Sequence, residues 1–212
     1  MSADEIADAY AEVADGLARW QWLDRLVAGR YRRRQFSSAE GRVLDVACGT
    51  GQNFRSLQDT SEVVGIDVSE AMLTHAREEL ARRPVSGTVR QMDAQRLAFE
   101  DDRFDTVVSS FSTCTFPDPA AALREMERVC RPDGQILLLE HSRSDVAPLA
   151  WLQDRRADSH YEKAGCRLDH EPLTTVREAG LVVENVRRWF FGLVTAIDVV
   201  PGPSGTAEVT DA

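Results

Sequence analysis

Two short apolar runs between residues 43 and 67 constrain the fold of this chain more than any other feature. The first run, residues 43–47, leads into a turn with two glycines, Gly49 and Gly51, and the second, residues 63–67, ends in the carboxylate Asp67. In α/β proteins, a strand that enters a glycine turn, followed by a strand with an acidic end, marks the ligand-binding edge of a parallel sheet. We therefore predict a nucleotide-type site where these two strands end.

Strands and helices alternate along the chain on both sides of these runs, which is typical of a parallel sheet with crossover helices. Ser69 is predicted to cap a helix, and Arg131–Pro132–Asp133–Gly134 to form a turn. The predicted strands are 43–47, 63–67, 88–92, 104–109 and 135–140, and the predicted helices are 52–57, 69–82 and a segment that starts behind Pro117 and ends near Val129.

Beyond residue 145 the pattern is weaker, and we expect helices at 149–161 and 172–179. Two β-rich segments, 181–190 and 193–200, are separated by Gly192 and should form a hairpin. We expect one domain over residues 1–200. Its parts are a helical lid at 1–35, a cofactor-binding core at 36–145, and an acceptor cap with the hairpin at 146–200, before a disordered tail at 201–212.

The first 28 residues predict an amphipathic helix over residues 4–28. A basic cluster follows it. Two interpretations stay open: the apolar stripe packs on the domain, or the helix forms a lid or an interfacial element with arginines near anionic headgroups. The stripe consists of Ile6, Tyr10, Val13, Leu17, Trp20 and Val27, and the basic cluster of Arg30, Arg32, Arg33 and Arg34.

The composition argues against nucleic acid as the main partner. The formal charge is −10, from 35 acidic and 25 basic residues, whereas proteins that bind nucleic acid concentrate lysine and arginine. No apolar run approaches the length of a bilayer span. Because no cysteine pair has close spacing and no secretory signal opens the chain, we expect reduced thiols in a cytoplasmic protein. The four cysteines are Cys48, Cys114, Cys130 and Cys166.

The neighbours of the glycine turn narrow the choice of ligand. A dinucleotide site requires a third small residue at position 54, which is Phe54 here. Asp45, before the turn, would repel a pyrophosphate but suits an ammonium or sulfonium group. Asp67 is placed to accept hydrogen bonds from both ribose hydroxyls. A ligand with a ribose and positive charge but no phosphate is indicated, and S-adenosylmethionine fits that description.

Four blocks in this order, LDVACGTG, VVGIDVSEAML, MDAQRLAFEDDRFDTVVSSF and LREMERVCRPDGQILLLEH, resemble class I S-adenosylmethionine-dependent methyltransferases over residues 40–145. Within them the chain is most similar to the quinone and phospholipid methyltransferases. ACGTGQNF, Glu140–His141, Trp151 and the run GCRL at 165–168 are also similar to thiol methyltransferases of the methyltransferase-like 7 type. The resemblance implies a Rossmann-like, doubly wound α/β sheet of seven strands, parallel except for an antiparallel last strand.

The resemblance also implies which residues hold the cofactor. The methionine part would lie against Ala47, Gly49 and Gly51, with Asp45 near its amino group. The backbone of two residues at the end of the fourth strand, Ser109 and Ser110, would flank the methionine. The ribose and adenine would lie against Asp67, Val68, Met72, Asp93 and Ala94. Asp93 could instead serve a turn.

Methyl transfer from a sulfonium requires mainly positioning, and a base only where the acceptor must lose a proton. His141 is our candidate base because its ordinary pKa lies near neutrality, although a structural role at the strand end is equally compatible. Cys114 is interpreted as a pocket wall rather than a nucleophile. The acceptor-site candidates are Tyr10, Thr113, Cys114 and Glu140.

No metal site is expected, because the spacing of His160, Cys166 and His170 matches no common one. The N-terminal helix and residues 142–170 should roof a small-molecule acceptor. Its apolar or amphiphilic character is indicated by Trp20, Phe111, Phe116 and Trp151. Two alternatives remain: a module that binds the cofactor without catalysis, and a nicotinamide-dependent oxidoreductase. Peripheral membrane contact stays open, and the sequence does not indicate the oligomeric state.

Overall fold

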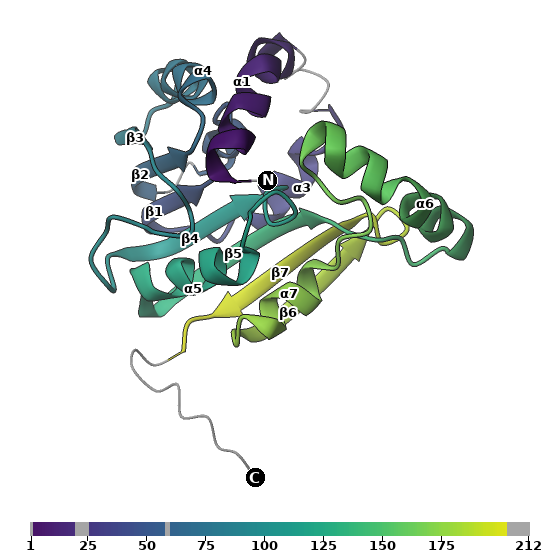
Figure 1. Ribbon diagram of the computed structural model, residues 1–212. Helices are drawn as coiled ribbons and strands as arrows, with labels where there is room; N and C mark the ends of the chain where they lie inside the picture. The colour runs from purple at the N-terminus through teal and green to yellow at the C-terminus, as the bar shows by residue number, and fades with distance from the viewer. Residues whose placement is uncertain (1, 20–25, 58–59, 203–212) are drawn as a thin grey trace.

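One seven-stranded sheet organises the computed structural model of this chain (Figure 1). The structure describes residues 2–19, 26–57 and 60–202. Along the sheet the strands follow the order β3-β2-β1-β4-β5-β7-β6. They are β1 Gly41–Val46, β2 Thr60–Asp67, β3 Gly87–Gln91, β4 Phe104–Ser110, β5 Cys130–His141, β6 Val182–Trp189 and β7 Val194–Val200.

Strand pairing confirms the predicted fold class. The strands from β1 to β5 pair in parallel, and β7 is antiparallel to both of its neighbours, β5 and β6. The chain runs outward from β1 in both directions, through β2 to β3 and through β4 to β5. This switch point places the carboxyl ends of β1 and β4 side by side, with Val46 opposite Ile66 and Ser109, where ligands of open α/β sheets bind.

Helices cover both faces of the sheet. In Figure 1, α1 and α4 lie above the sheet as drawn, and α5 and α7 lie below it. The helices described are α1 Ala3–Arg19, α3 Gly29–Gln35, the 3₁₀ helix η1 Gln52–Ser56, α4 Glu70–Ala81, α5 Pro119–Val129, α6 Ala147–Ala164 and α7 Pro172–Glu178.

Alternation along the strands builds two apolar cores. Val43 of β1 points to the core that Leu73 of α4 and Phe54 of η1 complete. Leu44, its neighbour in sequence, points to the opposite core, which includes Leu123 of α5. Because successive side chains of a strand point to opposite faces, a sheet buried on both sides requires the nearly continuous apolar runs seen in this sequence.

The predicted helix over residues 4–28 is matched where the structure describes it, by α1 (Ala3–Arg19) and by helical residues 26–27, but the predicted apolar stripe is only partly buried. Of the predicted stripe, Ile6 is buried and Tyr10 half-buried, but Val27 is 62% exposed. The side chains of Val13 and Leu17, and all of Trp20, lie outside the described residues. The basic cluster forms a separate helix, α3. Its Arg32 is buried, so this arginine does not extend toward solvent or headgroups.

Two local predictions also change. Ser69 stands at the N-cap of α4, yet its side chain makes no capping hydrogen bond. Instead its backbone N–H donates to Asp67 Oδ1, so the aspartate stabilises this turn. The predicted turn at Arg131–Gly134 lies inside β5 as an irregularity: Cys130 pairs with Phe104 and Gln135 with Thr106. The predicted tail falls largely outside the described residues.

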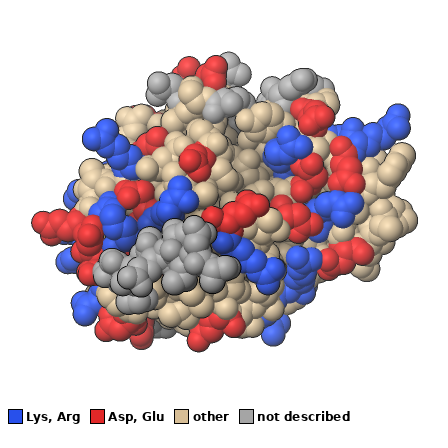
Figure 2. Space-filling model, turned by 60° about the horizontal axis from the view of Figure 1, so that its bottom comes forward, with Lys and Arg blue, Asp and Glu red and all other residues tan. Residues whose placement is uncertain are grey.

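The surface carries charge of both signs. Figure 2 shows acidic and basic side chains interspersed over the face that is brought forward. Among the helices that the structure describes, none is long and apolar enough to cross a membrane.

Candidate active site

A cavity of about 400 Å³ lies at the carboxyl edge of the sheet, above β1, β2 and β4. Its walls come from the turns after the first four strands and from α1, α3 and α4. The described lining residues are Ala3, Ile6, Tyr10, Arg32, Ala47, Cys48, Gly49, Thr50, Gln52, Asn53, Asp67, Val68, Met72, Met92, Asp93, Ala94, Ser110, Phe111, Ser112, Thr115, Phe116 and Pro117.

Two strained residues stand at the centre of this edge. Ala47 follows β1 and Phe111 follows β4, and each has a φ of 54° although neither is glycine. Both turns are fixed by backbone hydrogen bonds to the next strand: Cys48 N–H donates to Ile66 O and Phe111 N–H to Leu139 O. Non-glycine residues in this left-handed region cluster at functional sites. Two of the five described non-glycine residues with positive φ therefore lie at this edge, where both line the cavity.

The two glycines of the turn have different tasks. A Cβ added at Gly49 would meet nothing within 4 Å, so this position faces the open cavity. A Cβ at Gly51 would lie 2.7 Å from the ring of Phe54. Gly51 therefore makes room for a buried ring, while Gly49 leaves room for a ligand.

Asp67 is held by the backbone at the end of β2. Its Oδ2 accepts a hydrogen bond from Gly49 N–H at 2.9 Å and its Oδ1 one from Ser69 N–H at 2.9 Å. Burial raises the pKa of Asp67, and the backbone hydrogen bonds oppose that rise. Each carboxylate oxygen can accept a second hydrogen bond, so Asp67 keeps capacity for a ligand.

A buried polar network crosses the floor of the cavity. Arg32 Nε donates to Asn53 Oδ1 at 3.0 Å, and Asn53 Nδ2 donates to Asp45 Oδ1 at 2.9 Å. Ser110 Oγ also donates to Asn53 Oδ1, at 2.8 Å. Burial raises the pKa of Asp45 to about 7, against the lowering effects of Asn53 and Arg32. Asp45 therefore lies beneath the cavity, linked to it through Asn53.

Asp93 anchors the turn after β3. Its Oδ1 accepts from Gln95 N–H at 2.9 Å, and the Gln95 side-chain amide donates to both of its oxygens at 3.1 Å. The turn role weighed from the sequence is thus present, and Asp93 lines the cavity as well.

Glu140 supports the loop after β4 from below. It is fully buried, and its carboxylate accepts hydrogen bonds from the backbone N–H of Ser112 at 3.0 Å and of Thr113 at 3.4 Å. Burial raises the pKa of Glu140 to about 7. Thr113 in turn shares a hydrogen bond of 2.9 Å with Nε2 of His170. Burial lowers the pKa of His170 to about 4.

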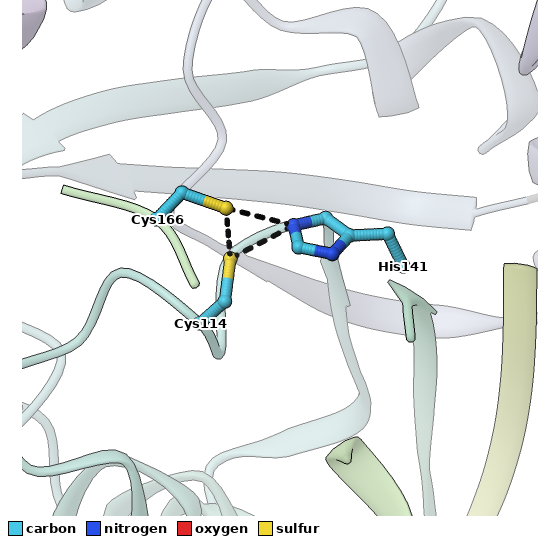
Figure 3. Close-up of side chains that lie close together, drawn as sticks. All are labelled: Cys114, His141 and Cys166. Atoms are coloured by element: carbon cyan, nitrogen blue, oxygen red, sulfur yellow. Dashed lines mark hydrogen bonds between the residues drawn. The ribbon is translucent and has the colours of Figure 1, made fainter. Parts of the chain in front are cut away.

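His141 lies next to two cysteines rather than in the cavity. Figure 3 shows its Nε2 directed at Sγ of Cys114 and of Cys166, each at 3.0 Å. The hydrogen bond with Cys114, and then that with His141, lowers the pKa of Cys166. The same bond to Cys166 raises the pKa of Cys114. Burial acts to lower the pKa of His141, but its interaction with Cys166 outweighs that effect and raises it.

The matches to known proteins agree with this geometry. A protein-family model described as a methyltransferase domain matches residues 44–138. The ubiquinone/menaquinone biosynthesis C-methyltransferase UbiE of Ectopseudomonas mendocina is 32% identical over 177 residues, which are 77% of this chain and 68% of that protein. The chain belongs to the S-adenosylmethionine-dependent methyltransferases.

Other relatives of this methyltransferase match it over only part of their length or only in fold. A phosphatidylethanolamine N-methyltransferase of Cereibacter sphaeroides is 43% identical over 53% of this chain and 57% of that protein. The chain thus spans about half the length of several curated relatives that it matches. A crystal structure of a SAM-dependent methyltransferase from Thermotoga maritima superposes with a TM-score of 0.71, at 20% identity, over 93% of this chain and all of that one. That likeness concerns the fold.

The cavity of this methyltransferase suits S-adenosylmethionine in its chemistry. Two carboxylates, Asp67 and Asp93, line it, and Arg32 is the one basic residue among the described lining residues. Arg32 donates into the network of Asn53 and Asp45. The acidic balance suits a cationic ligand, and the space beside Gly49 admits one close to the backbone.

Most of the predicted cofactor residues of this methyltransferase meet at the cavity. Three lie outside its lining. Asp45 is beneath it, Gly51 faces Phe54, and Ser109 Oγ donates to Val46 O and contacts Ser112 Oγ. The residues that do line it are Ala47, Gly49, Asp67, Val68, Met72, Asp93, Ala94 and Ser110.

The acceptor-side predictions divide differently. Tyr10 lines the cavity, as do Phe111 and Phe116. The other catalytic and acceptor candidates lie behind the wall, and Trp151 is 60% exposed. No residue beyond Pro117 lines the cavity in the described part of the chain, so the roof expected from residues 142–170 stays a prediction. The candidates behind the wall are Thr113, Cys114, Glu140 and His141.

Sequence reasoning missed two residues of the cavity floor, Asn53 and Arg32. Asn53 lies two residues after Gly51 in ACGTGQNF, so its closeness to the glycine turn could have indicated a place in the site. Arg32 had none, because it stands in a run of three arginines whose pattern resembles a solvated surface.

Proposed function

We propose that this chain transfers a methyl group from S-adenosylmethionine to a small, largely apolar acceptor. The cavity at the carboxyl edge of β1, β2 and β4 is the observation that carries the proposal. It combines an acidic lining for a cationic cofactor with an apolar wall on the side of α1 and of the loop after β4. That wall consists of Ile6, Tyr10, Phe111 and Phe116.

The cofactor, when bound, supplies an electrophilic methyl group on a sulfonium. Asp67 accepts hydrogen bonds from the ribose hydroxyls, through the lone pairs that Gly49 and Ser69 leave free. Val68, Met72 and Ala94 offer apolar surface for the adenine. The network of Arg32, Asn53 and Asp45 balances the charge beneath the methionine part.

The acceptor lies against Phe111 and Phe116, and the protein's contribution is to hold its nucleophilic atom in line with the methyl group. No histidine is among the described residues that line the cavity. Burial raises the pKa of Tyr10 well above its ordinary value, so its hydroxyl stays protonated and donates a hydrogen bond rather than taking a proton. The site therefore favours acceptors that bring their own lone pair or ionise readily.

The names of the relatives point to two acceptor classes, a quinone precursor for UbiE and the amine of phosphatidylethanolamine for the second enzyme. An apolar wall suits the hydrophobic part of either molecule. We place an amphiphilic acceptor first, and small thiols, which need little activation, second.

Transfer from S-adenosylmethionine with a labelled methyl group to a panel of quinols, phosphatidylethanolamine and small thiols tests the proposal. We expect labelled product from at least one amphiphilic acceptor. Calorimetric titration with S-adenosylmethionine and with NAD is the companion measurement. Tighter binding of NAD would overturn the proposal. Tight cofactor binding without transfer to any acceptor would instead favour a module that binds without catalysis.

A further inference from the structure

Three side chains from distant parts of the sequence converge beside the cavity. Cys114 lies in the loop after β4, His141 ends β5, and Cys166 follows α6. Figure 3 shows the three side chains directed at one another. The two sulfur atoms are 3.1 Å apart, and Nε2 of His141 lies 3.0 Å from each of them. The donor atoms thus form a nearly equilateral triangle.

The surroundings of this Cys–His triangle are partly shielded from water. Cys114 is 7% exposed, and the other two members are half-buried. The ring of His141 stacks on Phe111, with centroids 6.4 Å apart and planes 11° from parallel. Phe111 also lines the cavity. The triangle therefore stands directly behind the apolar wall, although none of its members lines the cavity itself.

Two sulfurs and one imidazole nitrogen are a donor set for a thiophilic ion. Zinc binds cysteine sulfur at about 2.3 Å and histidine nitrogen at about 2.0–2.1 Å, which separates neighbouring donors of a tetrahedron by about 3.6–3.8 Å. The triangle must therefore open by roughly half an ångström. Because Cys114 and Cys166 both lie on loops, that adjustment leaves the sheet in place.

We propose that Cys114, His141 and Cys166 bind one thiophilic divalent ion, best matched by Zn²⁺. The ion ties the segment after α6 to the carboxyl ends of β4 and β5. Three protein ligands leave a fourth position, as in zinc sites that are not purely structural. On binding, each thiol that is still protonated gives its proton to solvent, since only the thiolate ligates.

Outside the triangle, two hydrogen bonds of His170 already connect the same segment to the residues at the ends of β4 and β5. Thr113 Oγ1 contacts His170 Nε2 at 2.9 Å, and Arg143 N–H donates to His170 O at 2.9 Å. An ion at the triangle would add a third connection between this segment and the strand ends. Its binding therefore has a local structural readout that is independent of methyl transfer.

Metal stoichiometry tests the proposal on the full chain. The protein is reduced, stripped with a chelator, supplied with Zn²⁺ without oxygen, and measured by elemental analysis and by competition with a chromophoric chelator. We expect one ion per chain. We also expect affinity to fall by at least about 100-fold in C166S and in H141A, since even losing a partner of a metal ligand costs 10–100-fold. Co²⁺ in place of Zn²⁺ should give a thiolate-to-metal absorption band that C166S loses.

Matched controls separate the triangle from other thiols and imidazoles. Cys130 lies at the opposite end of β5, and His75 of α4 pairs with Asp15 of α1. Cys130→Ala and His75→Ala should both retain the ion. His160→Ala asks whether this neighbour of Cys166 supplies the fourth ligand: a further loss of affinity places it in the site, and unchanged affinity leaves three ligands.

Amide hydrogen exchange provides the local measurement. Zn²⁺ should slow exchange over residues 166–170 in the wild type and not in C166S, whose fold is checked by circular dichroism. Three outcomes overturn the proposal: no ion in the reduced wild type, binding that survives both C166S and H141A, or loss of two free thiols to a Cys114–Cys166 disulfide in place of metal uptake.

Discussion

The cavity and the Cys–His triangle lie at the same edge of the sheet, but they are assembled differently. The cavity is built mainly from segments that follow β1, β2, β3 and β4 in turn, so each part lies next to a recognisable strand. The triangle joins a loop after β4, the end of β5 and a segment 25 residues farther along. A site of the first kind can be predicted from local sequence motifs, whereas a site of the second kind depends on how segments far apart in the sequence pack together.

Of the changes considered, replacing Phe54, whose ring lies against Gly51 of the glycine turn, should have the largest effect on stability and on cofactor binding. Phe54 is 1% exposed and belongs to the core between the sheet and the helices α3, η1 and α4. Phe54→Ala should lower the free energy of unfolding by about 3–5 kcal/mol, the usual cost of truncating a buried phenylalanine, and should also weaken binding of S-adenosylmethionine. Denaturant unfolding and calorimetry measure both.

Phe104→Ala is the matched control for that experiment. Phe104 is fully buried at the start of β4, in the opposite core. It should cost similar stability while leaving cofactor affinity near the wild-type value in folded protein. Equal losses of cofactor affinity in both variants would mean that the cavity responds to global stability and not to its floor.

Removing the carboxylate of Asp67 should weaken binding of S-adenosylmethionine by about 1–3 kcal/mol, because it deletes acceptors for the ribose and leaves two backbone N–H groups without their partner. Zn²⁺ binding at the triangle should not change. Calorimetric titration of Asp67→Ala measures the first quantity. Glu62→Ala, on the same strand at the exposed ion pair with Arg42, is the control; an unchanged affinity in Asp67→Ala would remove Asp67 from the site.

Asp45 should make the stability of the cofactor-free protein depend on pH. Its pKa is raised from 3.8 to about 7 by burial, so the folded state holds a proton that the unfolded state releases. The stability that this proton confers is complete below about pH 4 and is lost as pH rises through about 7, with a slope of up to about 1.4 kcal/mol per unit. Asp45→Asn, which resembles the protonated acid, should flatten this part of the profile.

Glu140 contributes a slope of the same sign, because burial also raises its pKa to about 7. The measurement for Asp45 is therefore the difference between the unfolding profiles of the wild type and of Asp45→Asn from pH 4 to 8. Parallel profiles would show that Asp45 does not carry the proton.

Thr113→Val should have the smallest effect of these changes, and it should act on the Cys–His triangle and not on the cavity. It removes the hydrogen bond between Thr113 and His170, at a cost of about 1 kcal/mol in the free energy of unfolding. Cofactor affinity should stay unchanged, whereas Zn²⁺ affinity should fall modestly because the segment after α6 is held less firmly. A loss of cofactor affinity alone would reverse the proposed division between the two regions.

The same division explains what the sequence could predict. Gly49 and Asp67 were found because each follows directly on an apolar strand, and parallel strands bring their carboxyl ends to one edge. Seven strands and the hairpin followed from patterns of the same short range and from the family resemblance. Arg32, by contrast, became a cavity residue only because α3 packs over η1, which no local pattern of arginines indicates.

The Cys–His triangle could not be predicted from the sequence, and the reason is physical. Its three members are separated by 27 and 25 residues, and their approach depends on the path of the chain after α6. The pairing considered from spacing, Cys166 with His160 and His170, used neighbours in sequence. The structure brings Cys166 to His141 and Cys114 instead.

The ring of Phe54 also has a consequence for how related sequences can diverge. A Cβ at Gly51 would lie 2.7 Å from this ring, and one at Gly65, on β2, would lie 2.9 Å from it. Positions 54 and 65 therefore form an epistatic pair. A side chain at position 65 requires a smaller residue at position 54 and also room beside Cys48 Sγ, which lies 3.0 Å from that Cβ, whereas Gly51, with a φ of 79°, favours glycine whatever the size of the ring.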